Sequence, residues 1–276
     1  MIQKVKVWII RIWKLITRPE MLVLPGQLAY FFLLAIVPTI TLMAYGASFF
    51  HLSFDFLTNF MTKAFGSEVS SLLLPIVSNV DINAQFLITL AIGFYAASTG
   101  AASIIVTSNQ MYGIPNSSFL ERKVKALIMT FILVLLLLFL LLIPVFGDSI
   151  IELLQFVNLN QNVTKTISFT IHLMKGPISW FIIFFLIKII YTMAPDKEIA
   201  SKTNTYGALF TTFGFIIATM IYSFYISHFA HYANLYGGLA QFVVLMVWLY
   251  LLAYIFVIGI AINTEKLEKK GDIEIA

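Results

Sequence analysis

At residues 131–143 the sequence reads FILVLLLLFLLLI, and every position of this stretch is apolar. A half-buried strand would alternate apolar and polar side chains, and a lipid-exposed strand outside a closed barrel would leave its peptide groups unpaired. The stretch is therefore helical. With its apolar flanks it reaches the roughly 20 residues that a helix needs to cross a bilayer. It predicts a membrane protein.

The composition of the whole chain leads to the same class. Of its 276 residues, 60% are hydrophobic and only 11% are charged, whereas soluble domains are about 25% charged. The net charge is +4, but the charges gather in short clusters between apolar runs. That distribution is typical of loops beside an anionic leaflet and not of a nucleic-acid-binding face. The absence of cysteine excludes disulfides and thiol chemistry.

Six stretches are long and apolar enough to span the membrane. We predict an all-α fold, a polytopic transmembrane helical bundle of about six spans that forms a single membrane domain over residues 1–276. The spans are 22–50, 84–111, 126–147, 177–194, 204–227 and 238–262, and residues 263–276 form a tail.

Three further segments predict amphipathic interfacial helices. In residues 1–18, Trp8 and Ile12 fall on one helical face and Lys14 and Arg18 on the other, as in a helix that lies on the cytoplasmic leaflet. This segment lacks the apolar core and small-residue cleavage site of a signal peptide, so we expect no cleavage. Residues 52–80 and 149–175 are also amphipathic, and we expect both on the outer side.

The basic residues predict the orientation. They gather in the N-terminal arm, in the connections after the second and fourth spans and in the tail, whereas the opposite connections hold only Lys63 and Lys165. Basic residues mark cytoplasmic loops. We therefore expect a bacterial inner (plasma) membrane protein with both termini in the cytoplasm.

Three groups of residues together resemble one family. They are Leu28 to Pro38, the pair Ser98-Thr-Gly100 and Asn109-Gln-Met-Tyr112, and a longer set that includes Tyr236-Gly-Gly-Leu-Ala, Trp248-Leu-Tyr250 and Asn263-Thr-Glu265. Over about residues 20–266 the chain resembles the YihY/BrkB family, whose members were long labelled ribonuclease BN. The resemblance implies a six-span inner-membrane protein and supplies no catalytic residue. The chain departs from it at Ala261-Ile262, where many members are expected to have an acidic residue.

The ribonuclease label can be tested against the acidic residues. A metal-dependent nuclease needs clustered carboxylates or histidines on one side of the membrane. The predicted cytoplasmic acids are instead scattered at span ends among lysines, as solvated helix-end charges would be. We therefore predict no catalytic residue, no metal site, no cofactor and no nucleic-acid partner, and expect that the chain is not an enzyme. These acids are Glu20, Glu121, Asp196, Glu198, Glu265, Glu268, Asp272 and Glu274.

Polar and small residues mark a candidate path through the bundle. Gly100, Ser103, Thr107 and Gln110 recur at helical spacing, with Asn109 beside them. Close helix packing explains such a stripe, and we favour it; the alternative is a polar path for a lipid headgroup. Lys188 lies about two turns inside the fourth span, where it either extends to the headgroups or binds an anionic one.

Prolines and glycines interrupt or thin several spans. Such residues are either packing features or hinges, and Gly237-Gly238 is typical of a tight turn that re-enters the membrane. The candidates are Pro38, Gly207, Gly237, Gly238 and Gly259.

These features favour handling of a membrane amphiphile. We expect transport, flipping or positioning of a lipid or a lipid-linked anionic substrate, with membrane lipids as partners. The first alternative is a structural or partner-binding membrane protein that transports nothing. The second, less favoured, is the ribonuclease of the family label.

Overall fold

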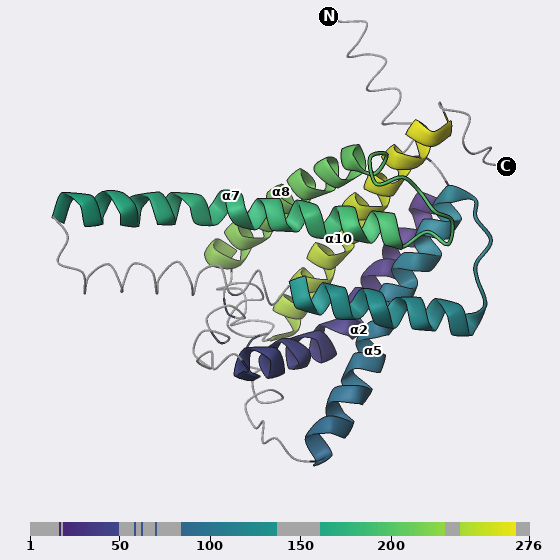
Figure 1. Cartoon of the computed structure of the whole chain (residues 1–276), viewed down its shortest axis with the longest axis horizontal. Coiled ribbons are helices and arrows are strands. Elements are labelled where there is room, and N and C mark those ends of the chain that lie inside the picture. The colour runs from purple at the N-terminus through teal and green to yellow at the C-terminus, as the bar shows by residue number, and fades with distance from the viewer. Residues whose placement is uncertain are drawn as a thin grey trace, which may run out of the picture.

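Long helices make up most of the described part of this computed structural model, which comprises residues 17, 19–49, 58, 62, 70, 84–136, 161–229 and 238–268. The described residues contain no strand, and the predicted all-α fold is confirmed. The helices are α2 (Glu20–Phe49), α5 (Ala84–Tyr112), α7 (Gln161–Met193), α8 (Thr205–Phe229) and α10 (Gly238–Glu268), with a further helix over residues 119–136 (Figure 1).

Four of these helices contain a stretch long and apolar enough to cross a membrane: Ala91–Tyr112, Gly176–Met193, Thr205–Tyr225 and Phe242–Glu265. A shorter apolar stretch, Glu20–Ile36, lies in α2. The part of the predicted span 126–147 after residue 136 lies outside the described residues. So does most of the predicted interfacial segments 1–18 and 52–80. These helices form a membrane-spanning helical bundle.

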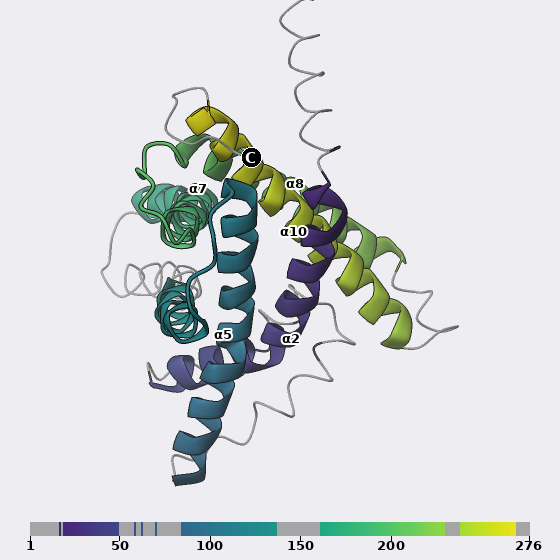
Figure 2. The ribbon, with the colours of Figure 1, turned by 90° about the vertical axis from the view of Figure 1, so that its right-hand side faces the viewer.

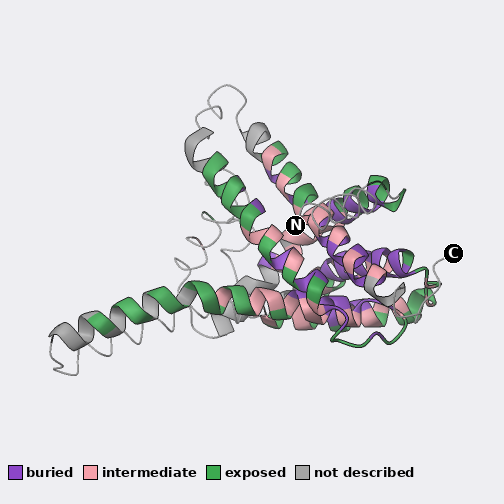
Figure 3. Ribbon diagram, turned by 90° about the horizontal axis from the view of Figure 1, so that it is seen from above, coloured by how far each residue is buried: buried purple, intermediate pink, exposed green. Residues whose placement is uncertain are grey.

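α7 is longer than the sequence predicts. We expected an interfacial segment that ends near 175 and a separate span from 177, but one helix runs from Gln161 to Met193 with Pro177 inside it. A proline removes only a local hydrogen bond and can be accommodated as a kink, so the helix continues. At 1.5 Å per residue α7 is about 50 Å long, which exceeds the roughly 30 Å hydrocarbon core. Its first half extends beyond the other helices, and the side chains that the structure describes there are exposed (Figures 1 and 3).

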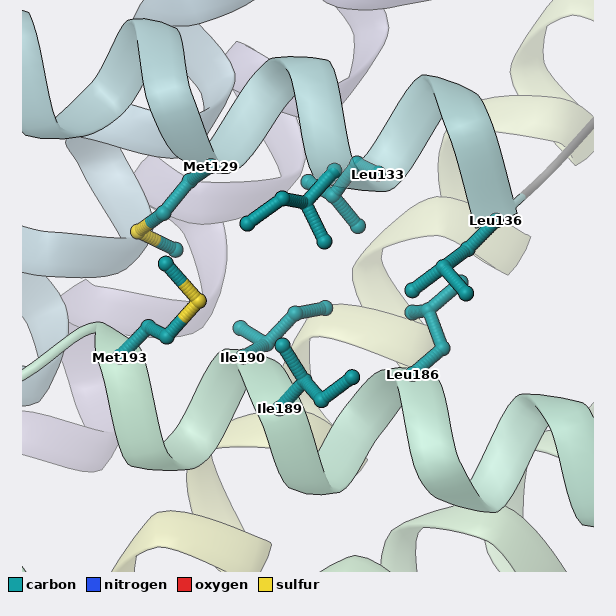
Figure 4. Close-up of a pocket in the computed structure, with 8 residues that line it drawn as sticks. Met129, Leu133, Leu136, Leu186, Ile189, Ile190 and Met193 are labelled. Atoms are coloured by element: carbon teal, nitrogen blue, oxygen red, sulfur yellow. The ribbon is translucent and has the colours of Figure 1, made fainter.

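The helix at 119–136 and α7 lie side by side, and both cross α5 at a steep angle (Figures 1 and 2). Their facing side chains point toward one another in an apolar seam, where the ends of the Met129 and Met193 side chains point toward each other (Figure 4). The seam leaves a void of about 10 Å³, which is no larger than one water molecule requires. This contact is closely packed, and its lining residues are Met129, Ile132, Leu133, Leu136, Leu186, Ile189, Ile190 and Met193.

α2 packs against α5 and α10, and it changes direction along its length (Figure 2). Pro38 lies within this helix, and a proline in a helix interior removes a backbone hydrogen bond and kinks the axis. A Cβ on Gly93 of α5 would lie 3.8 Å from the Cβ of Pro38, which is ordinary contact. The candidate hinge residue Pro38 therefore lies where α2 meets α5.

The candidate glycines of the last two spans lie at the crossing of α8 and α10. A Cβ on Gly207 would collide with the backbone carbonyl oxygen of Gly259, and a Cβ on Gly259 would collide with the hydroxyls of Thr211 and Tyr191. Small residues at such crossings let two backbones approach closely. Gly238 is the first residue of α10, and Gly237 lies outside the described residues.

The glycine contact predicts the effect of adding one methyl group. Gly207→Ala should lower the stability of the detergent-solubilised protein by about 1–3 kcal/mol, because the obstructing atom belongs to a backbone and cannot rotate away. Thermal unfolding would measure the loss. Gly176→Ala in α7 is the matched control, since no described atom lies within 4 Å of its added Cβ; it should be neutral or up to about 1 kcal/mol stabilising. Equal effects of the two substitutions would contradict a packing role for Gly207.

Candidate functional site

A group of polar side chains joins the end of α5, the helix at 119–136 and the end of α7. α5 ends at Tyr112, and Gly113 follows with a φ of 62°, in the left-handed region that favours glycine. The N–H of Ile114 donates to the carbonyl of Asn109 at 2.8 Å, and that of Gly113 donates to Gln110 at 3.2 Å. This Schellman turn starts the connection at 113–118 and places it beside the loop that follows α7.

Asp196, in the loop after α7, is the centre of this group. Its carboxylate accepts hydrogen bonds from Lys125 Nζ at 2.8 Å, from Asn109 Nδ2 at 2.6 Å and from the backbone N–H of Ser117 at 3.0 Å. Its own backbone N–H donates to Asn109 Oδ1 at 2.9 Å. Asn109, Ser117, Lys125 and Asp196 are called the Asp196 cluster below.

Lys125 also caps α7. Besides its ion pair, its ammonium donates to the carbonyl oxygens of Ala194 at 2.9 Å and Pro195 at 2.7 Å. These two carbonyls belong to the residues that directly follow α7, and a lysine beside the C-terminal end of a helix also interacts favourably with the helix dipole. Because an ammonium has three donors, all of the hydrogen-bonding capacity of Lys125 is used.

The environment of Asp196 stabilises its charged form. Burial alone would raise the pKa of its carboxyl group, but hydrogen bonds from Lys125, Ser117 and Asn109 outweigh burial and lower the pKa from 3.8 to about 2. The Asp196 side chain is only 12% exposed. The sequence-based interpretation of this acid as a solvated helix-end charge is therefore wrong.

Further hydrogen bonds connect the remaining helices near the same end. The hydroxyl of Tyr112 donates to Asn204 Oδ1 at 3.1 Å, and Asn204 Nδ2 donates to the carbonyl of Tyr191 at 3.2 Å. The backbone N–H of Gly207 donates to Asn263 Oδ1 at 2.8 Å. These bonds tie α5, α7, α8 and α10 together through buried polar groups.

A cavity of about 380 Å³ lies among α2, α5, the helix at 119–136 and α10, and it is called the central cavity below. Its walls are apolar apart from two threonines and the indole of Trp248, and the hydroxyl of Thr130 is already bonded to the carbonyl of Ala126 at 2.8 Å. Several wall residues flank Pro38, so the bend of α2 borders the cavity. The lining residues are Phe32, Ala35, Ile36, Thr39, Ile40, Ala97, Gly100, Ala101, Ile104, Thr130, Leu133, Val134, Trp248, Leu249 and Leu252.

The residues of the predicted polar path have different surroundings in the structure. Gly100 lines the central cavity, where its Cβ would lie 3.2 Å from Ala35 of α2. Ser103 and Thr107 are buried, and their hydroxyls have no hydrogen-bond partner among the described residues. Asn109 belongs to the Asp196 cluster, whereas Gln110 is exposed.

Lys188 is half-buried on α7, and α7 contributes no residue to the walls of the central cavity. The residues that sequence reasoning missed are Ser117, Lys125, Asp196 and Asn204. The sequence did offer a signal for these four residues, because all of them are polar and lie close to the ends of apolar spans. Within the described residues, no three His, Cys, Asp or Glu side chains gather where they could hold a metal ion.

Comparison with known proteins gives a consistent result. The family described as virulence factor BrkB matches residues 12–274. The ribonuclease-like protein YfkH of Bacillus subtilis is 30% identical over 242 residues, which cover 86% of this chain and 87% of that protein. A UPF0761 membrane protein of Pseudoalteromonas translucida is 28% identical over 267 residues, covering 91% of this chain and 84% of the relative. No solved structure matches.

The Asp196 cluster predicts a pH-dependent contribution to stability. Asp196→Asn should lower the free energy of unfolding by on the order of 2 kcal/mol at neutral pH, because it removes charge-assisted hydrogen bonds. The pKa of Asp196 is lower in the folded state than its ordinary 3.8, so the unfolded chain takes up the proton first. The advantage of the wild type is therefore complete above about pH 5 and is lost as the pH falls toward about 2.

Thermal unfolding from pH 7 to pH 3 would measure this difference. Glu198→Gln is the control, because Glu198 is an exposed acid in the same loop and should leave stability within about 0.5 kcal/mol of the wild type. If both variants lose stability equally, the cluster does not hold the two loops together.

Proposed function

The chain belongs to the virulence factor BrkB family, and we propose that it is a membrane protein that transports, flips or positions a lipid or lipid-linked anionic amphiphile. The central cavity is the observation that carries this proposal. Its volume of about 380 Å³ lies within the ~300–1,000 Å³ range of small-molecule sites.

The walls of the cavity favour a hydrocarbon chain as its occupant. Aliphatic and aromatic side chains offer an alkyl chain close contact, whereas a polar group placed there would find almost no partner and would be costly to bury. The residues Ala97, Gly100, Ala101 and Ile104 belong to the membrane-crossing stretch of α5, and Trp248, Leu249 and Leu252 to that of α10. The cavity is therefore at the depth of the lipid chains.

The charge distribution favours an anionic headgroup. Basic side chains lie on the segments next to the Asp196 cluster, where Lys197 and Lys202 are exposed and Arg122 is half-exposed. Cations at this level attract anionic lipids electrostatically.

The first alternative is a structural or partner-binding membrane protein, and the extent of polar tethering favours it. Both carboxylate oxygens of Asp196 and all three donors of Lys125 are already used to hold loops. The second alternative, a ribonuclease, comes from the name of the Bacillus subtilis relative. Cleavage of RNA that requires Asp196 or its neighbouring acids would support it.

The cavity proposal predicts the effect of filling the space. Val134→Trp places an indole at a half-buried wall position of the central cavity. It should lower the amount of lipid that copurifies with the protein at least about tenfold. Native mass spectrometry of the solubilised protein would count the bound lipid. Leu135→Trp, on the neighbouring and more exposed position outside the cavity walls, is the control. Unchanged lipid retention in Val134→Trp would refute the proposal.

A second experiment separates transport from scaffolding. Lys188→Ala and Ser103→Ala should slow the flipping of a fluorescent anionic lipid in reconstituted vesicles while protein abundance stays normal, if these side chains serve a lipid path. The hydroxyl of Ser103 has no partner among the described residues, so its loss should cost little stability. Vesicles in which wild type and both variants flip no lipid would favour the scaffold.

A further inference from the structure

A second apolar space of about 350 Å³ lies between α8 and α10 as a groove that opens to the outside of the bundle, and it is called the α8–α10 cavity below. It is similar in volume to the central cavity. Its walls also come from membrane-crossing stretches and include three aromatic residues, Tyr222, Tyr225 and Trp248. The other lining residues are Ala218, Ile221, Val244, Val247 and Leu251.

Trp248 lines both cavities and separates them. On α10, Leu249 and Leu252 face the central cavity, whereas Val244, Val247 and Leu251 face the α8–α10 cavity. Successive helical residues are 100° apart, because an α-helix has 3.6 residues per turn. These two sets therefore lie on adjacent faces of α10, with Trp248 on the boundary between them.

The position of this indole is fixed by its neighbours. The rings of Trp248 and Tyr222 are stacked, with centroids 4.8 Å apart and planes inclined by 21°. On its other side Trp248 packs against the cluster of Leu245 and Leu249. An aromatic side chain held in this way forms a wall between the two spaces and occupies neither of them.

We propose that the two cavities receive the two hydrocarbon chains of one two-chain anionic lipid, one chain on each side of Trp248. This inference rests on the proposed function and narrows its substrate class to lipids with two chains. Both spaces are apolar, similar in volume and at the same depth along α10, as two chains of one molecule require. A single-chain amphiphile would occupy the central cavity and leave the other empty.

The test compares two lipids that share a headgroup and differ in chain number. Dioleoyl phosphatidylglycerol and its single-chain oleoyl form would be titrated into the delipidated full-length protein in detergent, with binding measured by native mass spectrometry. The wild type should bind the two-chain lipid about tenfold more tightly, since each buried methylene adds to affinity. Val247→Trp should bring the affinity for the two-chain lipid down to that for the single-chain lipid.

Val243→Trp is the matched control for this substitution. Val243 and Val247 are one helical turn apart on α10 and are 50% and 61% exposed, so both positions can accept an indole without disturbing the core. Only Val247 lines the α8–α10 cavity. The control should therefore bind both lipids as the wild type does.

The outcomes distinguish this inference from the proposed function. If Val247→Trp retains the full preference for two chains, or if the wild type has none, the α8–α10 cavity holds no chain and the inference is wrong. The central cavity would still stand as a lipid site if Val134→Trp alone weakened binding. Failure of the wild type to bind either lipid would overturn both proposals.

Discussion

The ion pair between Lys125 and Asp196 fixes how the helices of this protein meet. Lys125 lies in the helix at 119–136 and Asp196 in the loop after α7. Lys125 bonds the carbonyls of Ala194 and Pro195, directly after α7, while Asp196 is held by Asn109 of α5. In a membrane, apolar contact alone gives little preference for one helix arrangement over another, because lipid tails are as apolar as leucine. Directional polar bonds at the helix ends therefore determine the register.

Away from the ion pair of Lys125 and Asp196, some helices are in close contact and others leave an apolar space between them. At the crossing of α8 and α10, Gly207 and Gly259 allow backbone contact that no larger residue would permit. On the other side of α10, the bend of α2 next to Pro38 borders a cavity of about 380 Å³. Tight contacts at one crossing and an apolar space at the next are what the proposed lipid-handling function requires, because a flexible hydrocarbon chain needs room while the helices stay in place.

The sequence predicted the fold better than the site. Apolar runs without alternation left only helices as an option, because a bilayer cannot solvate peptide groups, and the small residues Gly207 and Gly259 were recognised as interruptions of their spans. The pairing of Lys125 with Asp196 could not be predicted, since 71 positions separate them and charges at span ends look alike in a sequence. The position of Trp248 between two cavities depends on how α2 and α8 pack around α10. Local sequence patterns do not predict this packing.

The polar cluster and the central cavity are mechanically connected through α5. This helix carries Asn109 in the cluster and Gly100 in the cavity wall, nine residues and about 14 Å apart along one helical axis. Neither proline nor charged residue interrupts α5 between them, and helices without such breaks bend only gently. Widening the cavity by moving α5 away from α2 must therefore either break the contacts of Asn109 with Asp196 or carry the loop after α7 along with it.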